Sequence, residues 1–74
     1  MSMDELLQIL KGACPNIDFS KKDLVSSGAI DSLSFVNIIA ALEEKMGVTL
    51  DIMSIEPDDF ESVESIYKLV KGNE

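Results

Sequence analysis

Apolar residues recur at helical spacing in three stretches of the chain, and the segments between them show no sustained periodicity. Such a stripe suits a helix that packs on one side, because every third or fourth residue returns to the same face. Ser2 with Glu5 forms the S-x-x-E capping pattern, and Gly47 suits the left-handed position that ends many helices. The predicted helices cover residues 3–14 and 32–46 and the stretch that opens at Ser62 as N-cap and closes at Gly72.

The connections between these stretches complete the predicted fold. Residues 15–31 form a long loop, which four scattered apolar residues are expected to pin to the core: Ile17, Phe19, Leu24 and Val25. Residues 48–55 are expected to be an irregular loop, and residues 56–60 to make one short helical turn, with Pro57 in the first-turn position. We therefore predict an all-α fold: one domain over residues 1–74, a small bundle of three main helices plus one short helix.

The predicted second helix carries two apolar faces. On a helical wheel, one side is an ordinary core stripe of Phe35, Ile38, Ile39, Leu42 and Met46. The nearly opposite side carries a narrow apolar strip of Leu33, Val36 and Ala40, flanked by Ser34, Asn37, Glu43 and Glu44. Either the long loop or another helix covers this strip, or the strip is a docking surface for protein partners.

Composition narrows the classes of partner. The chain holds 14 acidic residues against 6 basic ones, for a net charge of −8 at pH 7. Such a chain repels phosphate backbones and anionic membranes, so we expect partners with basic patches and no nucleic acid. Cys14 is the only cysteine, in an apolar pattern typical of a buried thiol. With no membrane span or signal peptide visible either, we expect a cytoplasmic monomer.

The start of the second helix, Asp31-Ser32, presents either a simple cap or a reactive hydroxyl. Autonomous catalysis is disfavoured, because the chain has no histidine and its lysines show no sign of burial. No metal site is expected either, because the acids between Asp51 and Asp59 do not match a calcium loop. Two roles stay open. Either Asp31 caps the helix and Ser32 has no chemical role, or another enzyme attaches a phosphate-linked group to the Ser32 hydroxyl, where the helix N-terminus would tolerate the negative charge.

Residues 28–46, GAIDSLSFVNIIAALEEKM, resemble the acyl carrier and peptidyl carrier protein family, whose Asp-Ser-Leu hallmark stands here as Asp31-Ser32-Leu33. The resemblance extends over nearly the whole chain and agrees with the predicted order of helices and loops. It implies a carrier that is not itself an enzyme. Ser32 would receive 4′-phosphopantetheine from coenzyme A through a separate, magnesium-requiring phosphopantetheinyl transferase. The thiol of this arm would hold acyl or aminoacyl groups as thioesters for partner enzymes.

The resemblance also implies roles for residues around Ser32. Asp31 would help the transferase and its metal to engage the site. The residues implied in contacts with partner enzymes that activate or transfer the cargo are Leu33, Val36, Asn37, Ala40, Glu43 and Glu44. Three of these, Leu33, Val36 and Ala40, are the strip that the helical wheel gives independently of the family.

Several positions depart from the carriers of bacterial fatty-acid synthesis. Those carriers typically have acids where this chain has Ser34 and Asn37. They usually have no residue between the alanine and the aspartate, where this chain has Ile30. They also have a smaller side chain at the position of Phe35. The departures favour a specialised pathway over housekeeping lipid or fatty-acid biosynthesis. The alternatives are a D-alanyl or peptidyl carrier protein and, from another class, an unmodified helical adaptor that binds a partner through the same strip.

Overall fold

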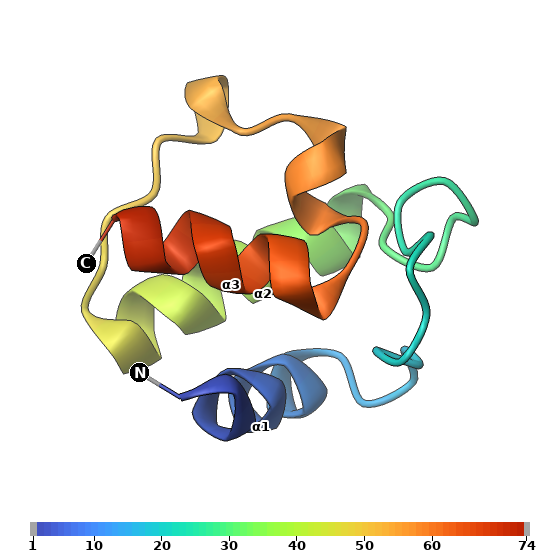
Figure 1. Cartoon of the computed structure of the whole chain (residues 1–74), viewed down its shortest axis with the longest axis horizontal. Helices are drawn as coiled ribbons and strands as arrows, with labels where there is room; N and C mark the ends of the chain where they lie inside the picture. The colour runs from blue at the N-terminus through green and yellow to red at the C-terminus, as the bar shows by residue number, and fades with distance from the viewer. Residues whose placement is uncertain (1, 74) are drawn as a thin grey trace.

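The computed structural model describes residues 2–73, which form three α-helices and two short 3-10 helices (Figure 1). The elements follow one another as α1 (Met3–Ala13), α2 (Ser32–Met46), η1 (Ile52–Ser54), η2 (Pro57–Phe60) and α3 (Val63–Gly72). The described residues contain no strand. The predicted all-α fold, with a long loop between the first two helices, is confirmed.

The helix ends form where the capping residues predict them. The Ser2 hydroxyl oxygen accepts the Glu5 backbone N–H at 3.2 Å, and the Ser62 hydroxyl oxygen accepts the Ser65 N–H at 3.2 Å. These bonds satisfy backbone donors that the first turn of a helix leaves without a partner. Gly47 takes the left-handed conformation with φ 68°, which a residue with a side chain rarely adopts.

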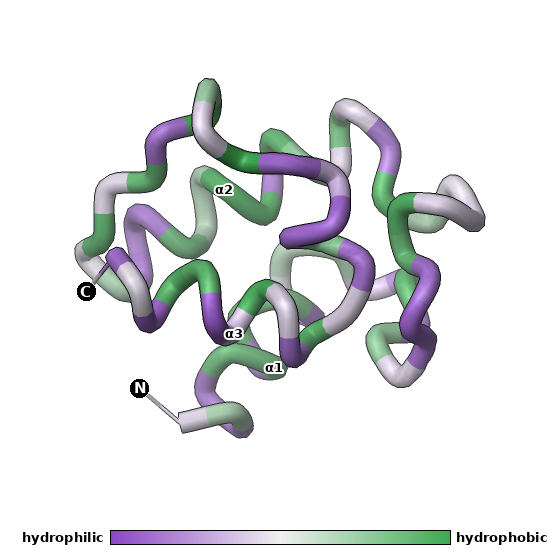
Figure 2. Tube along the Cα trace, turned by 45° about the horizontal axis from the view of Figure 1, so that its top comes forward, coloured by the Kyte–Doolittle hydropathy of each residue, from purple (hydrophilic) through white to green (hydrophobic). Residues whose placement is uncertain are grey.

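The core lies between the helices and beneath both connecting segments. α1 packs against α2 and α3, and η2 packs against α3. Figure 2 shows hydrophobic and hydrophilic segments alternating along the helices, as expected for helices with one buried side. The buried apolar side chains are Leu6, Leu10, Cys14, Phe19, Leu24, Ile30, Ile38, Ile39, Leu42, Val48, Leu50, Phe60, Val63, Ile66 and Val70.

The long loop before α2 is packed into this core. Phe19 and Leu24 are buried, and Ile17 and Val25 are half-buried against the same cluster, so the four expected anchors are confirmed. Ile30, at the end of the loop, is buried as well, with 5% of its surface exposed. The extra residue that sets this chain apart from fatty-acid carriers therefore has a packing role.

The segment after α2 contains one element that periodicity does not predict. Residues 52–54 form η1, whose N-cap Asp51 accepts the Met53 N–H through its carboxylate at 3.1 Å. The Asp51 carboxylate also accepts the Ser54 hydroxyl at 2.8 Å. A single 3-10 turn of this kind depends on such local bonds rather than on an apolar stripe, so a helical period does not reveal it. The short helical turn expected around Pro57 is confirmed as η2.

Candidate functional site

Ser32 is the first residue of α2, and its side chain is exposed. The preceding residue, Asp31, is the N-cap: its backbone is extended, and its carboxylate Oδ1 accepts the Ser34 backbone N–H at 2.8 Å. Asp31 therefore performs the capping, while Ser32 lies inside the first turn with its hydroxyl on the surface. The predicted cap is confirmed, and it leaves the serine accessible to another protein.

The charge around Ser32 is set by this cap. The hydrogen bond from the Ser34 N–H lowers the pKa of Asp31 below its ordinary value of 3.8, so the carboxylate is ionised near neutral pH. A negative charge is thus carried by the residue directly before Ser32, at the positive end of the α2 dipole. An ionised carboxylate at this place can attract a cation.

An open, largely apolar groove of about 520 Å³ has Ser32 among the residues that line it. It lies between the start of α2, the end of the long loop and the segment around η2. A larger hollow of about 630 Å³ lies between α1 and the far end of α2 and does not include Ser32. The residues that line the groove at Ser32 are Val25, Ile30, Asp31, Ser32, Phe35, Val36, Ile55, Glu56, Pro57 and Phe60.

Two aromatic rings meet in this groove. Phe35 of α2 and Phe60 of η2 pack with ring centroids 4.9 Å apart and planes inclined by 54°. Tilted pairs at this separation are favourable because the positive edge of one ring faces the negative face of the other. The large side chain of Phe35 thus joins α2 to η2. This agrees with its predicted place in the core stripe of the helix.

The second apolar face of α2 is exposed. Leu33 has 70% and Val36 57% of its surface exposed, and Ala40 is exposed on the same side. Neither the long loop nor another helix covers these residues, so the first of the two sequence-based alternatives is wrong. Asn37 and Glu44 are exposed beside the strip.

Glu43 differs from the other residues predicted to contact partners. It is half-buried, and its carboxylate accepts the Leu50 backbone N–H at 3.1 Å. This bond ties the segment after α2 back onto the helix. Glu43 therefore has a structural contact that the sequence pattern did not indicate, whereas Glu44 has a fully surface position.

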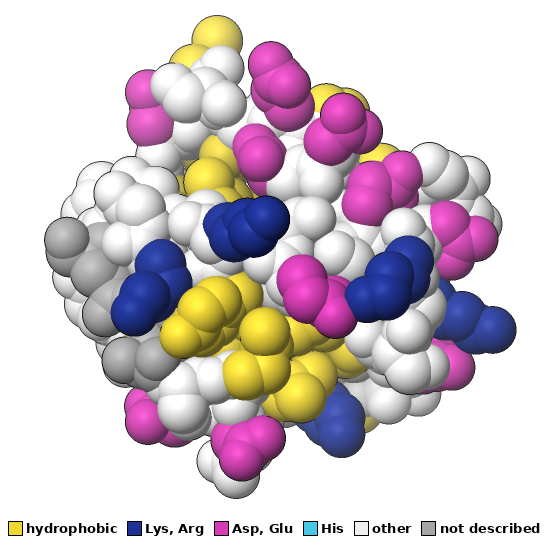
Figure 3. All heavy atoms as spheres, viewed as in Figure 1, with side chains coloured by type: hydrophobic (Ala, Val, Ile, Leu, Met, Phe, Trp, Pro, Cys, Tyr) yellow, Lys and Arg dark blue, Asp and Glu magenta, His cyan; other side chains and the backbone are white. Residues whose placement is uncertain are grey.

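Acidic side chains also gather near the groove on η2. Figure 3 shows them over η2 and the turn into α3, on the face where α3 lies in front. They include Asp58 and Asp59, in the first turn of η2. Among residues 2–73, no group of three or more His, Cys, Asp or Glu side chains is arranged to hold a metal ion. No helix in this part of the chain is long and apolar enough to cross a membrane.

Sequence reasoning missed Glu61, which lies in the turn between η2 and α3. Its carboxylate bonds to residues of the long loop before Ser32, 35 and 36 positions earlier in the chain. Nothing in the local sequence distinguishes Glu61 from the other acids around it, since its partners are distant along the chain. Cys14, in contrast, is buried as predicted, with its thiol directed at the Ser34 carbonyl oxygen at 3.9 Å.

The helical bundle exposes a capped serine beside an apolar groove, an arrangement that leaves the hydroxyl open to modification by another protein. The comparison with family models agrees: residues 4–70 match the model described as the phosphopantetheine attachment site. The chain belongs to this family of carrier domains. Comparisons with curated proteins and with solved structures gave no match.

Membership establishes the general role of the chain. It is a non-catalytic carrier that bears 4′-phosphopantetheine on a serine, receives it from a phosphopantetheinyl transferase and works with partner enzymes. The exposed serine and the adjoining groove fit such a group, since the arm is long, polar at its phosphate and ends in a thiol that forms thioesters. The Asp31 carboxylate and the α2 N-terminus provide opposite charges where Ser32 begins the helix.

Proposed function

We propose that Ser32 is the attachment serine and that the chain carries acyl or aminoacyl groups in a specialised pathway. The observation that supports this assignment is the position of Ser32: exposed at the first residue of α2, directly after a cap and at the mouth of the apolar groove. Asp31 assists the transferase, because its ionised carboxylate belongs to the residue directly before Ser32. The cytoplasmic location expected from the lone, buried Cys14 suits such a pathway.

Partner enzymes dock on the exposed strip of α2. Leu33, Val36 and Ala40 supply apolar contacts, and Asn37 and Glu44 supply polar ones. Glu43 contributes charge at the same end of the helix, although its carboxylate already bonds to the Leu50 N–H. Apolar side chains rimmed by acids match a partner surface with an apolar centre and basic residues around it.

The lining of the groove favours particular cargo. Asp31 and Glu56 place two carboxyl groups in it, and among the described residues that line it there is no lysine. Cargo that ends in a carboxylate is repelled by these groups, whereas a neutral acyl group or a protonated amine is not. An aminoacyl cargo, as in a D-alanyl or peptidyl carrier, is therefore the second candidate. Efficient malonyl transfer to the carrier, with no loading by an amino-acid adenylating ligase, would contradict this preference.

The attachment test uses intact mass spectrometry. Incubation of the apo protein with coenzyme A, magnesium and a broad-specificity transferase should add one phosphopantetheine mass, and fragmentation should place it on Ser32. Ser32→Ala should abolish the addition without changing the circular dichroism spectrum, because Asp31 rather than Ser32 caps α2. Modification of Ser32→Ala, or none of the wild type with several active transferases, would refute the assignment.

The same assay tests the strip and the adaptor alternative. Val36→Asp should reduce kcat/KM for the transferase by about tenfold or more, because it places a charge at the centre of an apolar contact. Asn73→Asp changes the charge by the same amount beyond the end of α3 and should have little effect. An unmodified adaptor would instead keep its partner after Ser32→Asp, a substitution that prevents attachment and preserves a residue suited to a helix start.

A further inference from the structure

Glu61 holds the loop that leads to Ser32. Its Oε1 accepts the backbone N–H groups of Val25 at 2.7 Å and of Ser26 at 2.8 Å. The Ser26 hydroxyl donates to Oε2 of the same carboxylate. The Glu61 backbone carbonyl also accepts the Leu24 N–H at 2.9 Å. One residue thus binds three consecutive residues of a segment that contains no helix of its own.

This contact continues along the loop to the serine. The Ile30 N–H donates to the Leu24 carbonyl at 2.9 Å, so the loop closes on itself between two buried side chains. Gly28, with φ 83°, provides the reversal that this closure needs. Asp31 follows Ile30 directly and begins α2. The place of Ser32 is therefore tied through the loop to the residues that Glu61 holds.

We propose that Glu61 is a positioning residue, which fixes residues 24–30 so that Ser32 is presented to the transferase in one conformation. The proposal rests on the assignment of Ser32 as the attachment site. Glu61 acts through the loop rather than on the serine hydroxyl. Without its carboxylate, the loop would populate several conformations, and only a fraction of the molecules would present Ser32 correctly at any time. The apparent affinity of the transferase falls by that fraction.

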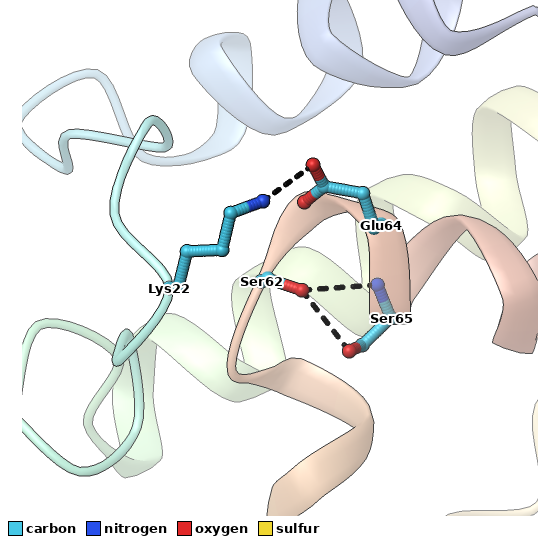
Figure 4. Close-up of polar contacts among 4 residues, drawn as sticks. All are labelled: Lys22, Ser62, Glu64 and Ser65. Atoms are coloured by element: carbon cyan, nitrogen blue, oxygen red, sulfur yellow. Dashed lines mark hydrogen bonds and ion pairs between the residues drawn. The ribbon is translucent and has the colours of Figure 1, made fainter.

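A second acid, three residues further along the chain, provides a matched comparison. Figure 4 shows Glu64, at the start of α3, paired with Lys22 of the loop, with Nζ and Oε2 2.6 Å apart. Their side chains are 58% and 72% exposed, so water and salt screen the pair and it contributes little. Glu64 therefore has the same charge, lies near Glu61 and contacts the same loop, but makes no bond to the loop backbone in the described structure.

The experiment compares Glu61→Ala, Glu61→Gln and Glu64→Ala in the full chain. The two alanine variants lose one carboxylate each, so their net charges are equal. Glutamine keeps an oxygen for the Val25 and Ser26 N–H groups, and its amide can donate to the Ser26 hydroxyl oxygen. Two quantities are measured: the hydrogen-exchange rates of the Val25 and Ser26 amides by NMR, and the kcat and KM of the transferase for each carrier.

Glu61→Ala should raise both exchange rates about tenfold or more and raise KM about three- to tenfold at unchanged kcat, since the bound transferase holds the loop itself. Glu61→Gln should return KM to within about twofold of wild type. Glu64→Ala should behave as wild type in both measurements. Equal KM values for the two alanine variants, or failure of Glu61→Gln to restore KM, would overturn the proposal.

Ser26→Ala covers the case in which Glu61→Ala does not fold. This variant removes one bond to the Glu61 carboxylate and leaves the two backbone bonds in place, so it should give a smaller rise in KM of about twofold. A wild-type KM for folded Ser26→Ala together with an unfolded Glu61→Ala would show that Glu61 serves stability alone. If the wild type is modified at another residue or not at all, the assignment of Ser32 fails instead.

Discussion

The two connections that flank α2 differ in how much of their length is held against the core. The connection before α2 buries Phe19, Leu24 and Ile30 and is bonded along its backbone by Glu61. The connection after α2 buries Val48 and Leu50 and then leaves the core. At η1, Ile52 is 54% and Met53 93% exposed, and Figure 1 shows this turn standing away from the three helices.

The connection before α2, which has more of its length in the core, is the one that leads to Ser32. Segments with few buried contacts open locally at a low free-energy cost, whereas segments with many buried contacts open only when much of the structure does. The groove at Ser32 has one wall from each connection, since Val25 and Ile30 precede α2 and Ile55 and Pro57 follow it. Ser32 thus follows directly after the connection that buries three side chains, whereas the connection that contains the exposed η1 supplies the other wall of the groove.

The largest expected effect follows from removing the central anchor of the first connection. Leu24 is fully buried, and its backbone bonds to both Glu61 and Ile30. Leu24→Ala should lower the free energy of unfolding by about 2–5 kcal/mol, because it removes buried surface and leaves a cavity. Since small domains have only about 5–15 kcal/mol in total, urea unfolding should show a large shift in midpoint at unchanged slope.

The corresponding change in the second connection is the control. Met53→Ala removes a large side chain from η1, but the side chain is almost fully exposed, so the free energy of unfolding should change by no more than about 0.5 kcal/mol. A loss as large as that of Leu24→Ala would mean that η1 packs as firmly as the first connection. The comparison between the two connections would then be wrong.

A smaller effect is expected from acid. Hydrogen bonds lower the pKa values of several carboxyl groups at the first connection, including Glu61 and Asp31. For Glu61 the bonds come from the Ser26 hydroxyl and then the Ser26 N–H, and for Asp31 the bond comes from the Ser34 N–H. The unfolded chain therefore binds protons more readily. The stability that these groups contribute is complete above their ordinary values of 4.5 and 3.8, and it is lost as pH falls through the lower folded values.

Thermal unfolding between pH 7 and pH 3 measures this contribution. The melting temperature should decline below about pH 4.5, the region in which unfolded carboxyl groups begin to bind protons. Glu61→Gln has no proton to bind at this position, so its curve should decline less steeply than that of the wild type. Parallel curves for the two proteins would show that Glu61 does not contribute to the acid sensitivity.

The features that sequence predicted are those encoded within a few residues. Ser2, Asp31 and Ser62 cap helices because each accepts a backbone N–H only three residues ahead. The two faces of α2 follow from its periodicity in the same way, and the exposure of Leu33 and Val36 agrees with that pattern. Asp-Ser-Leu opening such a helix was sufficient to suggest the carrier family.

The features that sequence did not predict depend on contacts between distant residues. The sequence around Glu61 does not set it apart from the neighbouring acids, and only the fold brings its carboxylate to the Val25 and Ser26 N–H groups. Ile30 stood out only as a departure from fatty-acid carriers, and the structure shows that its side chain fills the core. Glu43 was expected on the partner surface, but its bond to Leu50 depends on how the chain returns after α2. Periodicity carries no information about such pairings.

The tilted pair of Phe35 and Phe60 also gives this carrier an intrinsic spectroscopic probe. Aromatic rings shift the magnetic resonance frequencies of protons held above or beside them, and these two rings lie in the groove at Ser32. The chain has three phenylalanines, one tyrosine and no tryptophan, so the aromatic part of its spectrum is sparse. A group tethered to Ser32 that entered the groove would therefore be visible by NMR without any attached label, and one that remained in solvent would keep its free-solution frequencies.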